Sequence, residues 1–129
     1  MATIKQFEDL EIWQLARELC QDIYTIAQNS GLKKNYKLFD QIDGSSGSIM
    51  DNIAEGFERN GNKEFVYFLS ISKGSCGETR SQLYRVYDRK YINEEVFEKL
   101  KKKTIVLGQK IGSFMNYLSS SEYKGTKFK

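Results

Sequence analysis

The stretch that decides the fold runs from Asn93 to Leu118 and reads NEEVFEKLKKKTIVLGQKIGSFMNYL. Its core-type side chains recur at steps of three and four residues, at Phe97, Leu100, Thr104, Leu107, Ile111, Phe114 and Leu118. This spacing places them on one side of an α-helix. Asn93 is a favourable N-cap, and Glu94 and Glu95 fall in the first turn, where the helix dipole favours negative charge. The stretch therefore predicts a long amphipathic helix.

Three earlier segments repeat this spacing. The first contains Trp13, Ala16, Cys20, Ile23 and Ala27, widened by Ile12, Leu19 and Ile26. The second contains Phe39, Ile42, Ser46, Ile49 and Ile53, and the third contains Phe65, Leu69, Ser72, Cys76, Thr79, Leu83 and Val86. We predict that the glycine- and serine-rich run 44–48 is helical, because Ile42, Ile49 and Ile53 stay in register across it.

Turns that contain glycine or asparagine separate the segments at residues 29–35, 59–62 and 88–93, and no proline interrupts a helix. Short connections between four amphipathic helices favour antiparallel neighbours. We therefore predict an all-α fold, an antiparallel up-down-up-down four-helix bundle over residues 10–118. An N-terminal segment, residues 1–9, precedes it, and a polar C-terminal tail, residues 119–129, follows it.

Composition predicts a single soluble domain. The chain has 129 residues, of which 40% are hydrophobic and 29% charged, a balance typical of globular proteins. No apolar run approaches the roughly 20 residues that cross a bilayer, and the first nine residues lack the apolar stretch of a secretory signal. We expect a cytoplasmic protein with no membrane association.

The residue inventory argues against catalysis. The chain has no histidine, which removes the commonest general base and a common metal ligand, and its two cysteines, Cys20 and Cys76, are far apart. Asn52, Glu55 and Glu78 are the remaining candidates for carboxylate or metal chemistry. The alternative is that these three are hydrogen-bonded polar groups that fix helix register or subunit contacts. We favour the alternative and predict no catalytic residue, no metal and no cofactor.

Four glycines fall inside predicted helices. Gly44 and Gly47 are three residues apart, as are Gly74 and Gly77, so each pair lies on one helix face. A glycine inside a helix costs about 1 kcal/mol relative to alanine, so some contact is expected to offset the cost. One interpretation is close packing of the helices against each other, with Gly108 and Gly112 at the same level. The other is a contact surface for a second subunit.

Two groups of basic residues are candidates for nucleic-acid binding. Lys63, Lys73 and Arg80, with Tyr84 four residues on, share one side of the third predicted helix, and Lys33, Lys34 and Lys37 cluster before the second. Cations near an aromatic ring suit phosphate contact and base stacking. The alternative is a solvated charged face, since the net charge is only +3 and Glu64 and Glu78 lie close by.

Apolar residues exceed what four core stripes can bury. Those beside or outside the stripes are Leu10, Leu15, Val66, Ile71, Ile105, Val106 and Met115. A monomer would expose them, whereas a homo-oligomer would cover them. We therefore expect self-association.

Several motifs resemble those of one protein family. The run Ser48 to Phe57, SIMDNIAEGF, resembles the signature SIxxNIAEGF of the four-helix bundle proteins related to proteins encoded by intervening sequences within bacterial 23S ribosomal RNA genes. Lys63 to Glu78 resembles the second signature, KEFxxFLxxxxGSxxE, and Leu10 to Trp13 resembles the usual opening. The resemblance extends from about Phe7 to Leu118.

The resemblance implies an antiparallel four-helix protomer without known catalytic activity, assembled as a ring-like homopentamer. Its signature positions include Asn52, Glu55, Gly56 and Glu78. Relatives include the accessory protein of diversity-generating retroelements, which binds nucleic acid and a reverse transcriptase. The resemblance thus implies RNA or single-stranded DNA, and a protein such as a reverse transcriptase, as partners. Where many members have Gln-Ile-Arg-Arg, this chain has Gln-Ile-Asp-Gly at 41–44, which weakens the implied binding of nucleic acid.

Three hypotheses follow. The first is an oligomeric nucleic-acid-binding accessory protein, whose affinity would fall steeply with salt. The second is a homo-oligomeric protein-interaction scaffold that binds no nucleic acid. The third, an enzyme or a metal carboxylate site, would require bound metal that is lost when Glu55 is replaced by Gln.

Overall fold

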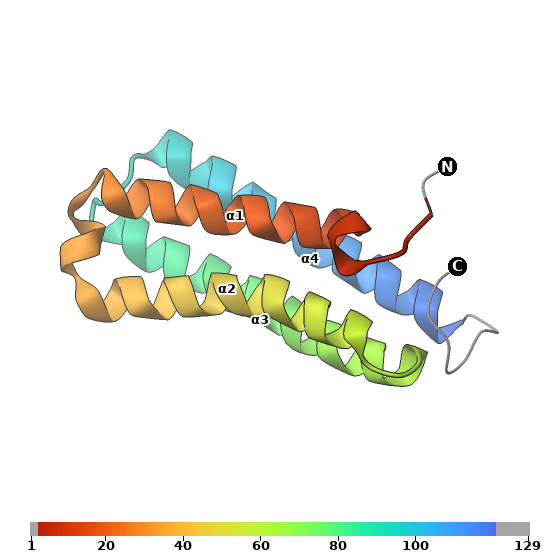
Figure 1. Ribbon diagram of the computed structural model, residues 1–129. Helices are drawn as coiled ribbons and strands as arrows, with labels where there is room; N and C mark the ends of the chain where they lie inside the picture. Colours follow the sequence, from red (N-terminus) through yellow and green to blue (C-terminus); the bar gives the residue numbers. More distant parts are fainter. Residues whose placement is uncertain (1–2, 121–129) are drawn as a thin grey trace.

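Four long helices make up most of the part of the chain that the structure describes, residues 3–120 of a computed structural model (Figure 1). They are α1 (Glu11–Gln28), α2 (Tyr36–Glu58), α3 (Asn62–Asp88) and α4 (Glu94–Ser119). Two 3-10 turns accompany them, η1 (Phe7–Asp9) before α1 and η2 (Gly31–Lys34) between α1 and α2. The all-α prediction is confirmed, since residues 3–120 contain no strand.

The helix ends have local causes. The side chain of Asn93 accepts a hydrogen bond from the backbone N–H of Val96 at the start of α4, and Asn35 caps α2 in the same way through Leu38. The turn between α2 and α3 passes through Gly61 with φ 89°, a conformation that favours glycine. Connections thus lie in the three places that the sequence predicts.

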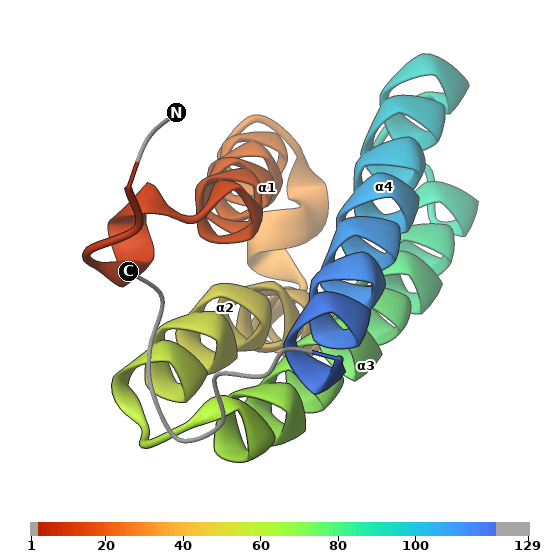
Figure 2. The same cartoon turned by 90° about the vertical axis from the view of Figure 1, so that its right-hand side faces the viewer.

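The helices run antiparallel to their chain neighbours. The α1–α2 and α3–α4 connections lie at one end of the bundle, and the α2–α3 turn lies at the other (Figure 1). Seen nearly along α1 and α2, the helices α3 and α4 run obliquely, so the two hairpins cross at an angle (Figure 2). Of the neighbouring pairs, α2 and α3 contact each other most and α1 and α4 least. The bundle is therefore tightest along α2 and α3.

The core follows the predicted stripes, with one shift. Every predicted core position of α3 is buried, and so are those of α2 and α4 except Phe39 and Phe114, which are half-buried. In α1 the buried line is Ile12, Ala16, Leu19, Ile23 and Ala27. Trp13 and Cys20, predicted as central, are only half-buried. Trp13 packs beside the core on Phe7, with ring centroids 5.2 Å apart, and the Cys20 thiol donates to the backbone carbonyl of Ser46 on α2.

A row of buried hydroxyl and amide groups joins α2 to α3, and we name it the polar seam. The Ser45 hydroxyl donates to Oε1 of Gln82 at 2.5 Å and lies 2.9 Å from the Thr79 hydroxyl. Ser72 Oγ donates to the backbone carbonyl of Ile49 at 2.7 Å. Within residues 3–120 no buried side-chain nitrogen or oxygen lacks a partner. The seam therefore fixes the register of α2 on α3 at no cost in unpaired polar groups.

The four mid-helix glycines do not pack helices together. A Cβ built on Gly44, Gly47, Gly74 or Gly77 would meet nothing within 4 Å. Gly44 and Gly74 are exposed, and Gly47 and Gly77 are half-buried, because serines and Thr79 occupy the α2–α3 contact instead. The prediction of close helix packing at these four glycines is wrong, and the subunit-contact interpretation stays a prediction.

Gly56 is the glycine that the fold requires. A Cβ there would lie 2.8 Å from Cβ of Phe68 and 2.9 Å from Cδ1 of Phe65. Non-bonded carbon atoms do not come this close, so the last turns of α2 approach α3 only because residue 56 has no side chain. The position belongs to the SIxxNIAEGF-like run, which gives that glycine a packing role.

Among the described helices, none has an apolar stretch long enough to cross a membrane.

Candidate nucleic-acid interface

A shallow groove with basic walls lies between α3 and α4. It has a volume of about 280 Å³ and is lined by Lys73, Cys76, Gly77, Arg80, Thr104, Ile105, Gly108 and Gln109. Two cations and no carboxylate therefore line it. Lys73 and Arg80 are two helical turns apart on α3, as their spacing predicts.

The two groove cations are available for a ligand. Neither Lys73 nor Arg80 forms an ion pair or a side-chain hydrogen bond with another described residue. The stem of Lys73 extends toward α4, since a Cβ on Gly112 would lie 3.3 Å from Lys73 Cε. Gly77 and Gly108 keep the groove walls low, so that a ligand can approach the backbone of both helices.

Tyr84 lies about one helical turn beyond Arg80 on α3. Its ring packs edge-on against Phe97 of α4 with centroids 4.9 Å apart, and the Lys101 ammonium lies 5.6 Å from its centroid. A hydrogen bond with Tyr84, together with the charge of Glu98, raises the pKa of Lys101 above 10.5. Tyr84 remains 44% exposed, so it extends the basic groove with an aromatic surface. Lys101 is a cation of this face that the third-helix pattern did not reveal, because it comes from α4.

The thiol in the groove wall is chemically inert. Burial raises the pKa of Cys76 to about 12, although Lys73 and Arg80 act in the opposite direction. The thiol therefore stays protonated at neutral pH, and a nucleophilic or metal-binding thiolate is not expected. Burial likewise raises the pKa of Cys20, against a hydrogen bond that the thiol donates to the carbonyl of Ser46. Both cysteines act as small packing residues.

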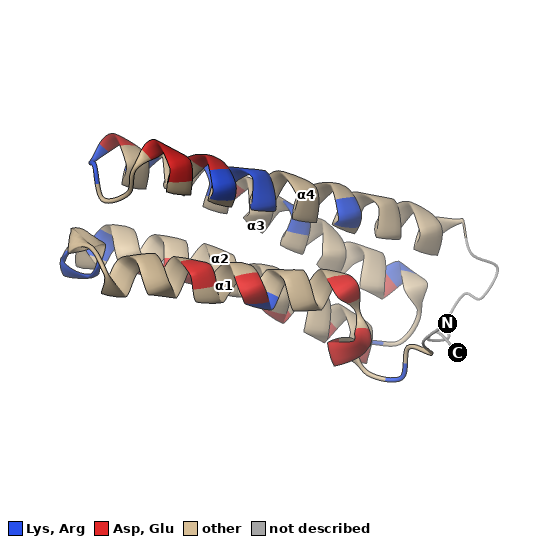
Figure 3. Ribbon diagram, turned by 90° about the horizontal axis from the view of Figure 1, so that it is seen from above, with Lys and Arg blue, Asp and Glu red and all other residues tan. Residues whose placement is uncertain are grey.

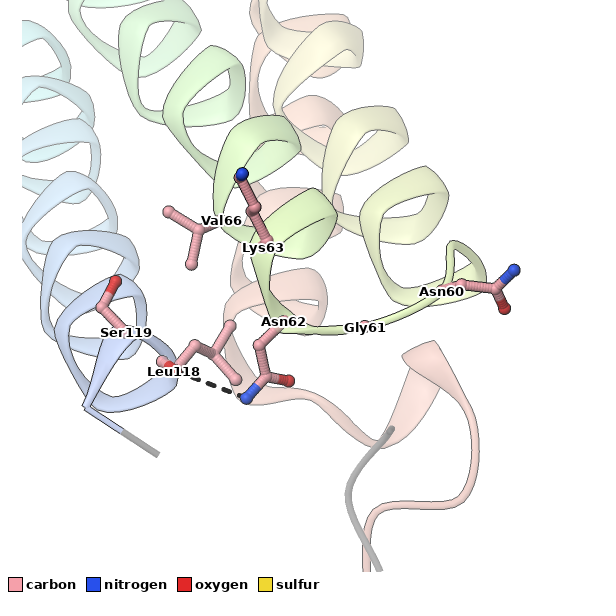
Figure 4. A pocket seen from close by; sticks show the side chains of 7 residues that line it. All are labelled: Asn60, Gly61, Asn62, Lys63, Val66, Leu118 and Ser119. Carbon is pink, nitrogen blue, oxygen red and sulfur yellow. Dashed lines mark hydrogen bonds between the residues drawn. The ribbon is translucent and has the colours of Figure 1, made fainter. Parts of the chain in front are cut away.

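Lys63 lies apart from this groove, at the end of the bundle where α2 turns into α3. It borders a hollow of about 440 Å³ whose other lining residues are Asn60, Gly61, Asn62, Val66, Leu118 and Ser119 (Figure 4). The Asn62 amide donates to the backbone carbonyl of Leu118 at 3.3 Å. About 15 Å of helix, ten residues at about 1.5 Å each, separates Lys63 from Lys73. The structure thus brings together Lys73, Arg80 and Tyr84 but not Lys63.

Lys33, Lys34 and Lys37 form a second basic region at the opposite end. All three are exposed, on η2 and the first turn of α2. The Asn35 amide donates to the Tyr91 hydroxyl at 3.2 Å, which holds η2 against the α3–α4 connection. That connection carries Arg89 and Lys90, so these two cations join the region, although the sequence separates them by more than fifty residues.

The candidate acidic and polar residues do not form a site. Asn52 Nδ2 donates to the carbonyl and the hydroxyl of Ser48, and Glu55 pairs with Arg59 at 2.6 Å. Glu78 is exposed on α3. Among residues 3–120 no group of three or more cysteine, aspartate and glutamate side chains is placed to hold a metal ion. The contacts of Asn52 and Glu55 are local to α2, and the structural interpretation of the three residues stays a prediction.

Charge is divided between the two hairpins. Residues 3–58 contain ten acidic and five basic residues, whereas residues 59–120 contain six acidic and twelve basic ones. Acidic residues of α1 lie beside basic residues of α4 along one side of the bundle (Figure 3), and Lys103 and Lys110 form ion pairs across it. The hairpin of α1 and α2 is therefore acidic and the hairpin of α3 and α4 is basic, although the net charge of the chain is small.

Comparisons place this fold among known proteins. A crystal structure of a protein of unknown function of the S23 ribosomal protein family, from Bacteroides thetaiotaomicron VPI-5482, is similar with a TM-score of 0.73 and 22% sequence identity, over 81% of this chain and 97% of that one. At this identity the likeness supports the fold alone. Comparison with the curated proteins gave no match. The model of the 23S rRNA-intervening sequence protein family matches residues 8–113, so this chain belongs to that family.

Proposed function

We propose that this protein is a non-enzymatic homo-oligomer that binds RNA or single-stranded DNA through the face formed by α3 and α4. The observation that carries the proposal is the groove between these helices, whose only charged lining residues are the unpaired Lys73 and Arg80. Cations without protein partners can neutralise phosphates at no loss of an existing ion pair, and release of counterions then drives binding.

The same face offers contacts to the rest of a nucleotide. Ile105 gives the groove an apolar floor, and the exposed part of Tyr84 provides a ring on which a base can stack. Each is a sequence-tolerant contact, so we expect binding with little base specificity and a preference for unpaired strands, whose bases are free to stack. The cations at Lys33, Lys34 and Lys37 extend the basic surface at one end of the bundle.

Self-association is supported by apolar side chains that the single chain leaves incompletely covered. Leu10, one of the seven residues expected outside the core, is buried within it, so that expectation was wrong for it. The others are half-buried or, for Ile71, 37% exposed. Four of them line three separate surface hollows: Leu15 and Val106 line the first, Val66 the second and Ile105 the third. A neighbouring copy would cover such surfaces.

Binding can be tested with the paired variant Lys73→Glu/Arg80→Glu. Affinity for fluorescent single-stranded RNA and DNA of about twenty nucleotides would be measured by anisotropy at several salt concentrations. Each lost phosphate contact is expected to lower the slope of log affinity against log salt by about 0.7 for a single strand. We expect the paired variant to lose at least tenfold in affinity.

The matched control is Lys5→Glu/Arg17→Glu, which makes the same change in net charge on the other hairpin, at two residues without an ion pair to a described residue. It should retain most of the affinity of the unchanged protein. Equal losses in both variants would show that only total charge matters, and binding that ignores salt would exclude the phosphate contacts proposed here.

The protein-interaction scaffold is the second candidate. It is favoured by the outer face of α3, where the small residues Ser70, Gly74, Gly77 and Ser81 lie between the exposed rings of Tyr67 and Tyr84. A protein that co-purifies after nuclease treatment, and is lost with Gly74→Arg, would support this candidate, provided that the protein binds no nucleic acid.

A further inference from the structure

A second groove lies between α1 and α4, where neighbouring helices contact each other least. It has a volume of about 320 Å³ and is lined by Leu15, Glu18, Lys99, Lys102, Lys103 and Val106. Leu15 and Val106 provide an apolar floor, and three lysines of α4 form one rim. We name it the α1–α4 groove.

The lysines of this groove are not equivalent. Lys103 Nζ lies 2.7 Å from a Glu18 oxygen and 2.5 Å from an Asp22 oxygen, so its charge is already neutralised within the chain. Lys99 and Lys102 form no ion pair with a described residue. The groove therefore presents uncovered apolar surface beside two available positive charges. A surface that fits this groove would be a ridge with exposed carboxylates and small side chains.

The chain itself carries such a ridge on the outside of α2. Opposite the core stripe of this helix runs a second line of residues at steps of three and four: Asp40, Asp43, Gly47, Asp51, Ala54 and Glu58. Its four carboxylates are exposed and form no ion pair with a described residue. At its centre a Cβ on Gly47 would meet nothing within 4 Å, so the ridge is low there. We name this line the acidic ridge.

The acidic ridge lies on the α1 side of α2. Asp43 and Asp51 both act on the thiol of Cys20 in α1, where their charges add to the rise in its pKa that burial causes. The α1–α4 groove lies on the other side of α1. Ridge and groove therefore occupy neighbouring sides of the bundle, with α1 between them.

We infer that the acidic ridge of one copy docks into the α1–α4 groove of the next copy, so that Asp43 and Asp51 meet Lys99 and Lys102 across the contact. Opposite charge and the match of a low ridge to an apolar groove support this pairing. The inference rests on the proposed function only in assuming that copies associate, and it specifies how they do so.

The positions of ridge and groove along the bundle fit such a contact. Both α2 and α4 begin at the same end of the bundle (Figure 1), and Asp43 lies seven residues into α2 while Lys102 lies eight residues into α4. At about 1.5 Å per residue the two surfaces are at nearly the same height, so successive copies need little shift along the bundle axis.

The test uses charge reversal on each surface separately. Lys99→Glu/Lys102→Glu disables the groove and Asp43→Lys/Asp51→Lys disables the ridge, and each variant alone should have the mass of a monomer by light scattering after size exclusion. An equimolar mixture should assemble again, since each ridge then finds a groove of opposite charge on the other variant. All four changes in one chain should restore the original assembly, because the charges are again complementary. Circular dichroism confirms that each variant is folded.

Three outcomes would overturn the inference: unchanged assembly in both variants, a mixture that stays monomeric, or an unchanged protein that is monomeric at all concentrations. Lys73→Glu/Arg80→Glu separates this result from the proposed function. If that variant assembles normally but no longer binds nucleic acid, the groove between α3 and α4 is the nucleic-acid site, whichever surfaces join the subunits. If nucleic acid never binds and the mixture still assembles, the subunit contact stands and the proposed binding falls.

Discussion

At the scale of single residues, the glycines divide into one that the fold needs and four that it does not. Gly56→Ala should lower the free energy of unfolding by about 1–3 kcal/mol, because its Cβ would overlap Phe68 and Phe65 and the helices would have to separate. Gly74→Ala is the control, since its Cβ meets nothing within 4 Å and alanine favours the helix by up to about 1 kcal/mol. Chemical denaturation measures both. A Gly56→Ala protein as stable as the unchanged one would show that α2 and α3 are not as close at this point as the structure has them.

The sequence could not assign these roles from spacing. Steps of three residues show that Gly44 and Gly47 share a face, but not which neighbour the face meets. In the structure Ser45 and Ser48 form hydrogen bonds with α3, and each is one residue from a glycine. A difference of one residue rotates a side chain by about 100° around the helix, which separates a buried contact from open solvent. The tight packing at Gly56 depends on two phenylalanines of another helix, which no pattern within α2 reveals.

At the scale of helices, the polar seam makes a quantitative prediction. Ser45→Ala should destabilise the protein by roughly 1–3 kcal/mol, because it leaves Oε1 of Gln82 and the hydroxyl of Thr79 without the partner they share. Ser81→Ala on the exposed side of α3 makes the same change in helix propensity and should cost nothing. Thermal or urea unfolding gives the difference. Equal stability of the two variants would mean that water or a rearranged side chain replaces the lost hydrogen bonds.

Helix number, order and turns could be read from the chain because each depends on local spacing and capping. Asn93 and the stripe from Phe97 to Leu118 needed no knowledge of the other helices. The core line of α1 could not be read from the chain in this way, since apolar residues cover two sides of the helix. The choice between Ile12 and Trp13 depends on which other segments pack against each side. Phe7, outside the predicted bundle, covers Trp13 and so leaves Ile12 to the core.

At the scale of the whole molecule, the small net charge of the chain hides the division of charge between the two hairpins. The acidic and basic residues nearly cancel, and only the pairing of helices brings Lys101 of α4 beside Tyr84 of α3. The candidate interface was predicted in part for this reason. Lys73, Arg80 and Tyr84 share one helix and were found by spacing, whereas Lys101 belongs to α4, and Arg89 and Lys90 join Lys33 only through the contact of η2 with Tyr91.

The attraction between hairpins has a measurable dependence on pH. Lys103 of α4 holds Glu18 and Asp22 of α1, and its hydrogen bond and charge lower the pKa of Glu18 below 4.5. A carboxylate whose pKa is lower in the folded state than in the unfolded state stabilises the folded state at pH values above the unfolded pKa. This stabilisation is lost as pH falls through the folded pKa. Burial works against the charge on Lys103, but its hydrogen bonds to Asp22 and Glu18 raise its pKa above 10.5, so it stays charged over this range.

We therefore expect Lys103→Met to melt at a lower temperature than the unchanged protein at neutral pH, and this gap to close as pH falls below 4.5. Lys37→Met removes an exposed lysine without an ion pair, so it should melt with the unchanged protein throughout. Melting temperatures are compared at one protein concentration, because association adds to apparent stability. A gap that persists in acid would mean that Lys103 stabilises α1 against α4 through the packing of its alkyl stem rather than through its charge.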